Sequence, residues 1–229
     1  MAGEPGLTTL SPEVRYRDDD VLVVEKPAGM LSHPVVAGEA GTLADWIRAE
    51  AGEAHLVNRL DRDTSGLVLA ARTARGRRIL DGQLARREVR RGYLAVVHGH
   101  PTEASGRVDA PIGRDPAAPS RRMVSPEGAA AVTRYRVVER LTDAALLELG
   151  LETGRTHQIR VHLEHLGYPV LGDRVYGQRG LELIGRQALH AHRISFRHLR
   201  LGEAVVVESP LPSDVETLLA RLRAASCER

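Results

Sequence analysis

The segment from Asn58 to Gly66 reads Asn-Arg-Leu-Asp-Arg-Asp-Thr-Ser-Gly and lies between two apolar stretches. Two aspartates, Asp61 and Asp63, stand one residue apart between arginines. One aspartate in a turn is usually structural, because its side chain accepts backbone N–H bonds. A carboxylate beside an arginine can also be a nucleophile, since the guanidinium favours the ionised, attacking form. The segment is therefore a candidate catalytic loop.

This loop also comes close to the Asp-x-Asp-x-Thr pattern of haloacid-dehalogenase-like phosphatases. Thr64 directly follows Asp63, however, so the spacing is one residue short and that class is disfavoured. A hydrolytic enzyme that uses Asp61 and Asp63 with magnesium remains a further hypothesis.

A second polar segment, Gly154 to Leu163, leads into a helix expected over Thr156–Leu166. Thr156 can cap its start, Gly167 can cap its end, and a following proline prevents continuation. At helical spacing the simplest partner of Arg160 is Glu164, in a surface pair worth about 0.3 kcal/mol.

Histidines 157, 162 and 165 in this segment raise the question of a metal site. The zincin pattern His-Glu-x-x-His places two histidines four residues apart, whereas these are five and three apart. No cysteine lies nearby, so we expect no metal site here.

Arginine supplies nearly all the positive charge. Between Arg72 and Arg91 the sequence has eight arginines and only two carboxylates, although the formal net charge of the chain is only +2. Such a local patch suits phosphate contacts, and a solvated helix face is the alternative. Tyr93 follows this patch at the head of an apolar strand, and an aromatic ring beside arginines is what base stacking requires.

The chain has 229 residues, of which 42% are hydrophobic and 27% charged, as in ordinary soluble globular proteins. No stretch approaches the length of a membrane helix and no signal pattern opens the sequence, so a cytoplasmic protein is expected. The single cysteine, Cys227, cannot form an internal disulfide. The only lysine, Lys26, lies in Glu-Lys-Pro, and there is no Gly-x-Gly-x-x-Gly run, so no nucleotide cofactor is expected.

These segments must be positioned by a mixture of strands and helices that do not alternate regularly, which favours an α+β fold with a mixed or mostly antiparallel sheet. A loose leader is expected over residues 1–13 and a glycine- and proline-rich region over 99–128. Strands are expected at 14–25 (a pair around a turn), 55–60, 67–72, 93–98, 130–139, 144–153, 189–196 and 204–208, and helices at 42–50, 73–88, 156–166 and 213–225.

Taken together and in this order, the segments resemble the RluA family of RNA pseudouridine synthases. The family signature His-Arg-Leu-Asp-x-x-Thr-Ser-Gly is similar to Asn58–Gly66, with Asn58 where histidine is common. The other matching segments are Lys26–Gly29, Tyr93–Gly99, Gly154–His162, Gly167–Tyr176 and Leu189–Ala191.

The resemblance implies a single pseudouridine synthase domain over residues 14–229, with a bent, mixed, largely antiparallel sheet, flanking helices and a central basic cleft. It implies Asp61 as the nucleophile, Arg160 as the arginine paired with it, and Tyr93 as the residue that stacks on the target base and transfers a proton at its carbon 5. Further substrate contacts are expected from Arg59, Arg62, Thr64, Arg155, His157 and Ile159.

The expected partner is a ribosomal or transfer RNA stem-loop, with Arg59 filling the space of the flipped uridine. Contacts to the RNA backbone are expected from Arg77, Arg78, Arg86 and Arg87. The family needs no cofactor, and a monomer is expected. A non-catalytic RNA-binding module is the alternative function.

Overall fold

The computed structural model describes residues 11–36, 38–53 and 55–227, so most of the expected leader lies outside the described residues. Along that part of the chain the elements are β1 (Glu13–Arg17), β2 (Val21–Lys26), α1 (Leu43–Ala51), β3 (His55–Leu56), β4 (Ser65–Ala71), α2 (Ala74–Ala85), β5 (Arg90–His98), β6 (Ser105–Asp109), β7 (Ile112–Arg114), β8 (Arg122–Val124), β9 (Val132–Leu141), β10 (Ala144–Leu151), α3 (Gln158–His165), β11 (Leu189–Arg197), β12 (Ala204–Glu208) and α4 (Ser213–Cys227).

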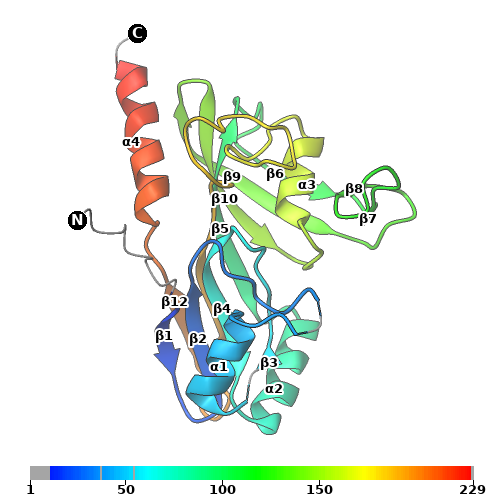
Figure 1. Cartoon of the computed structure of the whole chain (residues 1–229), viewed down its shortest axis with the longest axis vertical. Coiled ribbons are helices and arrows are strands. Elements are labelled where there is room, and N and C mark those ends of the chain that lie inside the picture. The colour runs from blue at the N-terminus through cyan, green and yellow to red at the C-terminus, as the bar shows by residue number, and fades with distance from the viewer. Residues whose placement is uncertain (1–10, 37, 54, 228–229) are drawn as a thin grey trace, which may run out of the picture.

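One long sheet runs through the molecule in the order β1-β2-β4-β11-β5-β10-β9-β6, with β12 beside β11 and β3 beside β4. Among the described strand pairs, only β4 and β11 are parallel. The predicted α+β fold with a mixed, largely antiparallel sheet is therefore confirmed. Figure 1 shows α1 and α2 beside the half that contains β1 to β4, and α3 beside the half that contains β9 and β10.

The half around β2 and β4 is covered on both faces. Leu22 and Val24 of β2 join the core that contains α1, whereas Val21 and Val23 join the core that contains Leu80 of α2. Strands buried on both faces need continuous apolar runs rather than alternation, which explains the unbroken Val21–Val24 stretch. No helix among the described residues has the length and apolar character needed to cross a membrane.

The helix start at Thr42 is confirmed, because its hydroxyl accepts from the Asp45 N–H in a capping box. The expected cap at Thr156 is wrong: α3 begins at Gln158, behind His157, whose backbone is left-handed with φ 57°. The end of α3 is as predicted. The N–H groups of Gly167 and Tyr168 turn back onto the last turn, in a Schellman motif.

The strand expected over 55–60 is shorter than predicted, because β3 ends at Leu56. Beyond it the side chain of Asn58 takes over the pairing with β4. Its Oδ1 accepts from the Leu69 N–H at 2.8 Å, and its Nδ2 donates to the Leu67 carbonyl at 3.3 Å. The backbone is thereby released from the ladder just before Asp61 and bends away from the sheet.

The chain re-enters the sheet at Gly66, in the short parallel contact between β4 and β11. Gly66 has φ +116°, and a Cβ atom there would lie 2.3 Å from the carbonyl oxygen of Ala191. Only glycine combines this backbone conformation with so close an approach. The residue that ends the signature segment is thus required by packing.

Gly66→Ala should lower the free energy of unfolding by about 2–4 kcal/mol, because strain in the backbone and overlap with β11 add. Gly150→Ala is the matched control, since a Cβ at Gly150 meets nothing within 4 Å and its φ is not positive. Urea unfolding of both variants measures the difference. Equal stabilities would contradict this account of Gly66.

Candidate active site

The central cleft opens where the loop after β3, the start of β5 and the segment between β10 and α3 meet. It has a volume of about 830 Å³. A narrower pocket of about 50 Å³, here called the Asp61 pocket, shares part of its wall. Most of the predicted site residues line this pocket, although they are far apart in the sequence: Arg59, Asp61, Thr64, Tyr93, Arg155, His157, Ile159 and Arg160.

Arg160 connects the loop that carries Asp61 with the segment after α3 that carries Asp173. Its Nη1 donates to Asp61 Oδ2 at 2.8 Å, while its Nε and Nη2 donate to the two oxygens of Asp173 at 2.6 and 2.9 Å. Glu164, the partner expected from helical spacing alone, pairs instead with Arg121 at 2.7 Å. The predicted pairing of Arg160 with Asp61 is therefore confirmed.

The guanidinium of Arg160 is held on all sides. Its side chain is only 6% exposed, and its central carbon lies 4.9 Å from the ring centre of Tyr176. Burial by itself would lower the pKa of Arg160, but the hydrogen bonds to Asp173 and the charges of Asp61 and Asp173 outweigh it and raise the pKa. A permanently charged group of fixed orientation thus faces Asp61.

Asp173 is a site residue that the sequence reasoning did not name. It is fully buried, and its Oδ1 also accepts from the N–H groups of Val175 and Tyr176. The signal that could have identified it was present, because Asp173 lies inside the matching segment Gly167–Tyr176. Its role depends on a contact with Arg160 that the segment alone does not reveal.

Tyr93 lies on β5 with its side chain in the Asp61 pocket, where it is 4% exposed. Burial raises the pKa of Tyr93. The nearby charge of Arg91 opposes that shift and Asp61 adds to it. Its hydroxyl has no hydrogen-bond partner among the described residues. It is therefore a neutral phenol that remains free to interact with a molecule in the pocket.

The loop that carries Arg155 and His157 is fixed by the buried amide of Gln158. The amide oxygen accepts from the Thr153 hydroxyl and the Arg155 N–H, and the amide nitrogen donates to Val132 O and Thr133 Oγ1. The amide therefore fixes the turn that leads into α3, and among the described residues no side chain caps the start of the helix.

His157 lines the Asp61 pocket and also contacts the hydroxyl of Tyr176, through Nδ1 at 2.9 Å. Burial lowers the pKa of His157, with Asp61 opposing the shift. Tyr176 therefore supports two walls of the pocket, because its ring also lies against Arg160.

The remaining predicted contacts differ in position. Thr64 and Ile159 are buried parts of the wall, and Thr64 accepts from Gln187 at 3.2 Å. Arg59 is exposed at the mouth and reaches Thr156 Oγ1 at 3.5 Å. Arg62 lines the central cleft but not the Asp61 pocket, and its Nε points to the Gly29 carbonyl. Arg62 thus lies farther from the pocket than the other predicted contacts.

The expected backbone-binding arginines lie on or after α2, outside the central cleft. Arg77 pairs with Asp81, Arg86 with Glu88 and Arg87 with Glu152, which leaves only Arg78 without an ion pair among the described residues. Contact of these four residues with RNA stays a prediction.

The buried histidine of the second segment has a structural role. His162 bonds Thr133 Oγ1 through Nδ1 and the Ala110 carbonyl through Nε2, so both ring nitrogens are engaged. Among the described residues, no three His, Cys, Asp or Glu side chains are grouped in a way that could hold a metal ion.

Lys26 is the second residue that the sequence reasoning did not assign to the site. It is fully buried, and its Nζ donates to the carbonyls of Pro27, Met30 and Arg62 at 2.7 to 2.9 Å. The lysine thereby ties the turn after β2 to the loop that carries Asp61. Burial lowers the pKa of Lys26 to about 7, against the opposing charges of Asp61 and Asp63.

Comparisons with known proteins agree with this geometry. Residues 20–165 match the family model described as RNA pseudouridylate synthase. The RNA pseudouridine synthase YlyB of Bacillus subtilis is 43% identical over 220 residues, which cover 92% of this chain and 73% of that protein. Ribosomal large subunit pseudouridine synthase D of Pseudomonas aeruginosa is 41% identical over 230 residues, with coverage of 92% and 72%. The solved structure of human RNA pseudouridylate synthase domain containing 4 superposes with a TM-score of 0.76 at 26% identity, covering 92% of this chain and 93% of that one.

Lys26 should titrate near neutral pH. Because it is the only lysine, selective ¹³C labelling gives one side-chain resonance, which should shift with a midpoint near pH 7. In the unfolded chain the amine of Lys26 keeps its proton up to about pH 10.4. The free energy of unfolding should therefore rise with pH between these values, relative to Lys26→Met, by about 1.4 kcal/mol per pH unit. A midpoint near that of a free lysine would contradict the prediction.

Proposed function

Since the chain belongs to the RluA family of RNA pseudouridine synthases, we propose that Asp61, Tyr93 and Arg160 carry out its reaction. The enzyme isomerises uridine in RNA to pseudouridine: the N-glycosidic bond breaks, the base turns, and it is rejoined to the ribose through carbon 5. The observation that supports the assignment most directly is the Arg160–Asp61 ion pair, which faces Tyr93 in one pocket.

Asp61 acts as the nucleophile. Its side chain is 25% exposed while that of Arg160 is 6% exposed, so the carboxylate is the member of the pair that a substrate can reach. Arg160 orients it through a charged hydrogen bond. From this position the carboxylate can attack the ribose, which releases the base as the N-glycosidic bond breaks, or it can add to the base across the double bond between carbons 5 and 6.

Tyr93 stacks on the base and transfers the proton that leaves carbon 5. Its raised pKa keeps the hydroxyl protonated in the free protein. The hydroxyl must therefore release its own proton to water as it receives the proton from carbon 5. The ring nitrogen that was bonded to the ribose takes up a proton in turn, so no proton is gained or lost overall.

The target uridine must leave its helix or loop to reach Asp61. Arg59, exposed at the mouth of the pocket, takes the space that the base leaves in the RNA. The walls formed by Thr64, Arg155, His157 and Ile159 contact the inserted base. No cofactor is required by this scheme.

Ribosomal RNA is the substrate class we favour, because several relatives at 41–43% identity are named for the large ribosomal subunit. A stem-loop of transfer RNA is the alternative. We further propose that residues 14–229 form one catalytic domain and that the protein acts as a monomer in the cytoplasm.

Asp61→Asn should reduce turnover roughly a thousandfold or more while RNA binding persists, because the amide keeps the shape but is not a nucleophile. Asp63→Asn is the matched control, two residues away, and should retain most activity. Tritium release from RNA labelled at carbon 5 of uridine measures both. Equal losses in the two variants would favour a two-carboxylate metal hydrolase, and wild-type release by Asp61→Asn would remove the assignment.

Asp173→Asn should lower kcat by about 10- to 100-fold, because a small misplacement of a catalytic group can cost up to about that much. The apparent affinity for RNA should change far less, since Asp173 is fully buried. Single-turnover kinetics and a circular dichroism spectrum separate slow chemistry from loss of fold. A folded variant with unchanged kcat would show that Asp61 alone holds Arg160 in place.

A further inference from the structure

The two faces of the central sheet differ in what they present. Successive residues of a strand point to opposite faces. Tyr93, paired across the sheet with Leu149, belongs to the face of the Asp61 pocket. The neighbouring pair, Gly92 and Gly150, therefore belongs to the opposite face. This second face has no role in the reaction described above.

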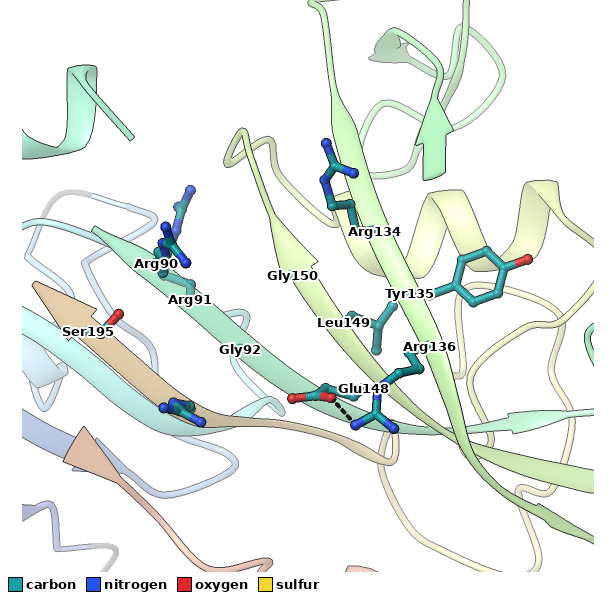
Figure 2. A pocket seen from close by; sticks show the side chains of 11 residues that line it. Arg90, Arg91, Gly92, Arg134, Tyr135, Arg136, Glu148, Leu149, Gly150 and Ser195 are labelled. Carbon is teal, nitrogen blue, oxygen red and sulfur yellow. Dashed lines mark hydrogen bonds and ion pairs between the residues drawn. The ribbon is translucent and has the colours of Figure 1, made fainter. Parts of the chain in front are cut away.

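On that face the glycine pair lies between two arginines. The registers of β9, β10, β5 and β11 place Arg134, Gly150, Gly92 and Arg193 in one row. At about 4.8 Å between strands, the arginines at its ends are about 14 Å apart. Between them lies a hollow of about 490 Å³, whose floor carries no side chain at the two glycines. Figure 2 shows Arg90, Arg134 and Arg136 around it.

The hollow, here called the arginine groove, is strongly basic. Four arginines of this face line it, namely 90, 134, 136 and 193, against one lining carboxylate, Glu148, which pairs with Arg136. Arg91 lines its edge, with its Nη2 donating to the Thr153 carbonyl on the side of the central cleft. Arg90 has no carboxylate partner among the described residues. The net charge of the whole chain is only +2, so this is a local concentration of charge.

Carboxylates beside the groove offset only part of its charge. Glu208 pairs with Arg193 at 3.3 Å. Glu152 pairs with Arg134 at 2.7 Å, but the same carboxylate also serves Arg87 at 3.2 Å and Arg107 at 3.7 Å. One negative charge shared by three guanidinium groups leaves the local field positive.

The arginine groove is continuous with the central cleft. A hollow of about 370 Å³ at the start of β5 shares Arg90, Arg91 and Arg134 with the groove, and it shares Leu151 and Glu152 with the cleft. Arg91 itself lines all three hollows. A basic path therefore leads from the mouth of the Asp61 pocket around the end of β5 to the other face.

We propose that the arginine groove binds the phosphate backbone of the RNA segment that flanks the target uridine. The inference rests on the proposed function, because it takes the uridine to enter from the central cleft. Phosphates suit guanidinium groups, and a glycine floor lets a nucleic-acid backbone approach the sheet closely. An acidic protein fits less well, since protein interfaces need apolar and aromatic side chains at their centre, where the groove has glycine.

The sharpest test compares Gly150→Glu with Gly150→Gln. A Cβ at Gly150 meets nothing within 4 Å, so both side chains fit, and they differ only in charge. The probes are a uridine-containing stem-loop and the same stem-loop extended at each end by about ten nucleotides, a typical length for a single-strand site. Fluorescence anisotropy gives the affinity for each. Extension should strengthen binding of Gly150→Gln, and that gain should fall roughly tenfold in Gly150→Glu, because a carboxylate repels phosphate.

A second comparison uses the arginines. Arg90→Gln/Arg193→Gln removes one unpaired and one paired guanidinium from the groove, since Arg193 pairs with Glu208. Arg17→Gln/Arg221→Gln removes a matched set elsewhere, because Arg17 pairs with Glu50 and Arg221 has no ion pair among the described residues. In a plot of the logarithm of the binding constant for the extended RNA against the logarithm of salt concentration, the slope should become less steep by about one to two in the groove variant. The slope of the control should not change.

Equal gains from extension in Gly150→Glu and Gly150→Gln, or equal salt slopes in the two arginine variants, would overturn the proposal. So would a loss in Gly150→Glu that is as large for the minimal stem-loop as for the extended one, because the groove would then not be binding the flanking RNA. Tritium release by wild type and Asp61→Asn on the minimal stem-loop tests the proposed function separately. The groove and the reaction can therefore fail independently.

Discussion

The buried guanidinium of Arg160 is the constraint on which the site depends. A charge withdrawn from water costs several kcal/mol unless partners replace the lost hydration. Two carboxylates and the ring of Tyr176 do so here, and Asp173 is in turn held by two backbone N–H groups. The catalytic loop, α3 and the segment after α3 must therefore assemble together. Removing either carboxylate leaves the buried Arg160 charge with a single carboxylate partner, so the geometry around Asp61 depends on the whole assembly.

The sheet supplies the second requirement, a backbone that leaves and re-enters it within ten residues. The Asn58 amide replaces the backbone of β3 in pairing with β4, and the chain rejoins the sheet at the start of β4, where only glycine fits at position 66 against Ala191 of β11. Lys26 fixes the loop between these two points by donating to the Arg62 carbonyl. The loop is thus held at both ends and in the middle by groups that do not touch the substrate. The loop that carries Asp61 is therefore anchored to the sheet on both sides.

Features that depend on contacts between residues close in sequence could be predicted from the residues alone, whereas those that depend on contacts between separate segments could not. The helix start at Thr42 and the end of α3 were predictable because capping is local. The Arg160–Asp61 pair came from the family resemblance, since helical spacing alone indicated Glu164. The early end of β3 and the missing cap at Thr156 could not be foreseen. The early end of β3 follows from the Asn58 side chain, which pairs with Leu69 of β4. The helix start at Gln158 follows a turn that is fixed by the Gln158 side chain through its contact with Val132 of β9. Asp173 and Lys26 lie in segments that match the family, but their roles depend on contacts with Arg160 and with the Arg62 carbonyl, which the sequence does not reveal.

The burial of Lys26 has a consequence for how the protein can be chemically regulated. It is the only lysine of the chain and it is fully buried, so every permanent side-chain cation on the surface is a guanidinium. Acetylation, methylation and ubiquitination act on lysine amines, and none is presented by a side chain of the folded protein. Guanidinium groups also retain their charge at any physiological pH. The attraction of these guanidinium groups for polyanions is therefore beyond the reach of enzymes that modify side-chain amines, and it responds to ionic strength and to competing anions.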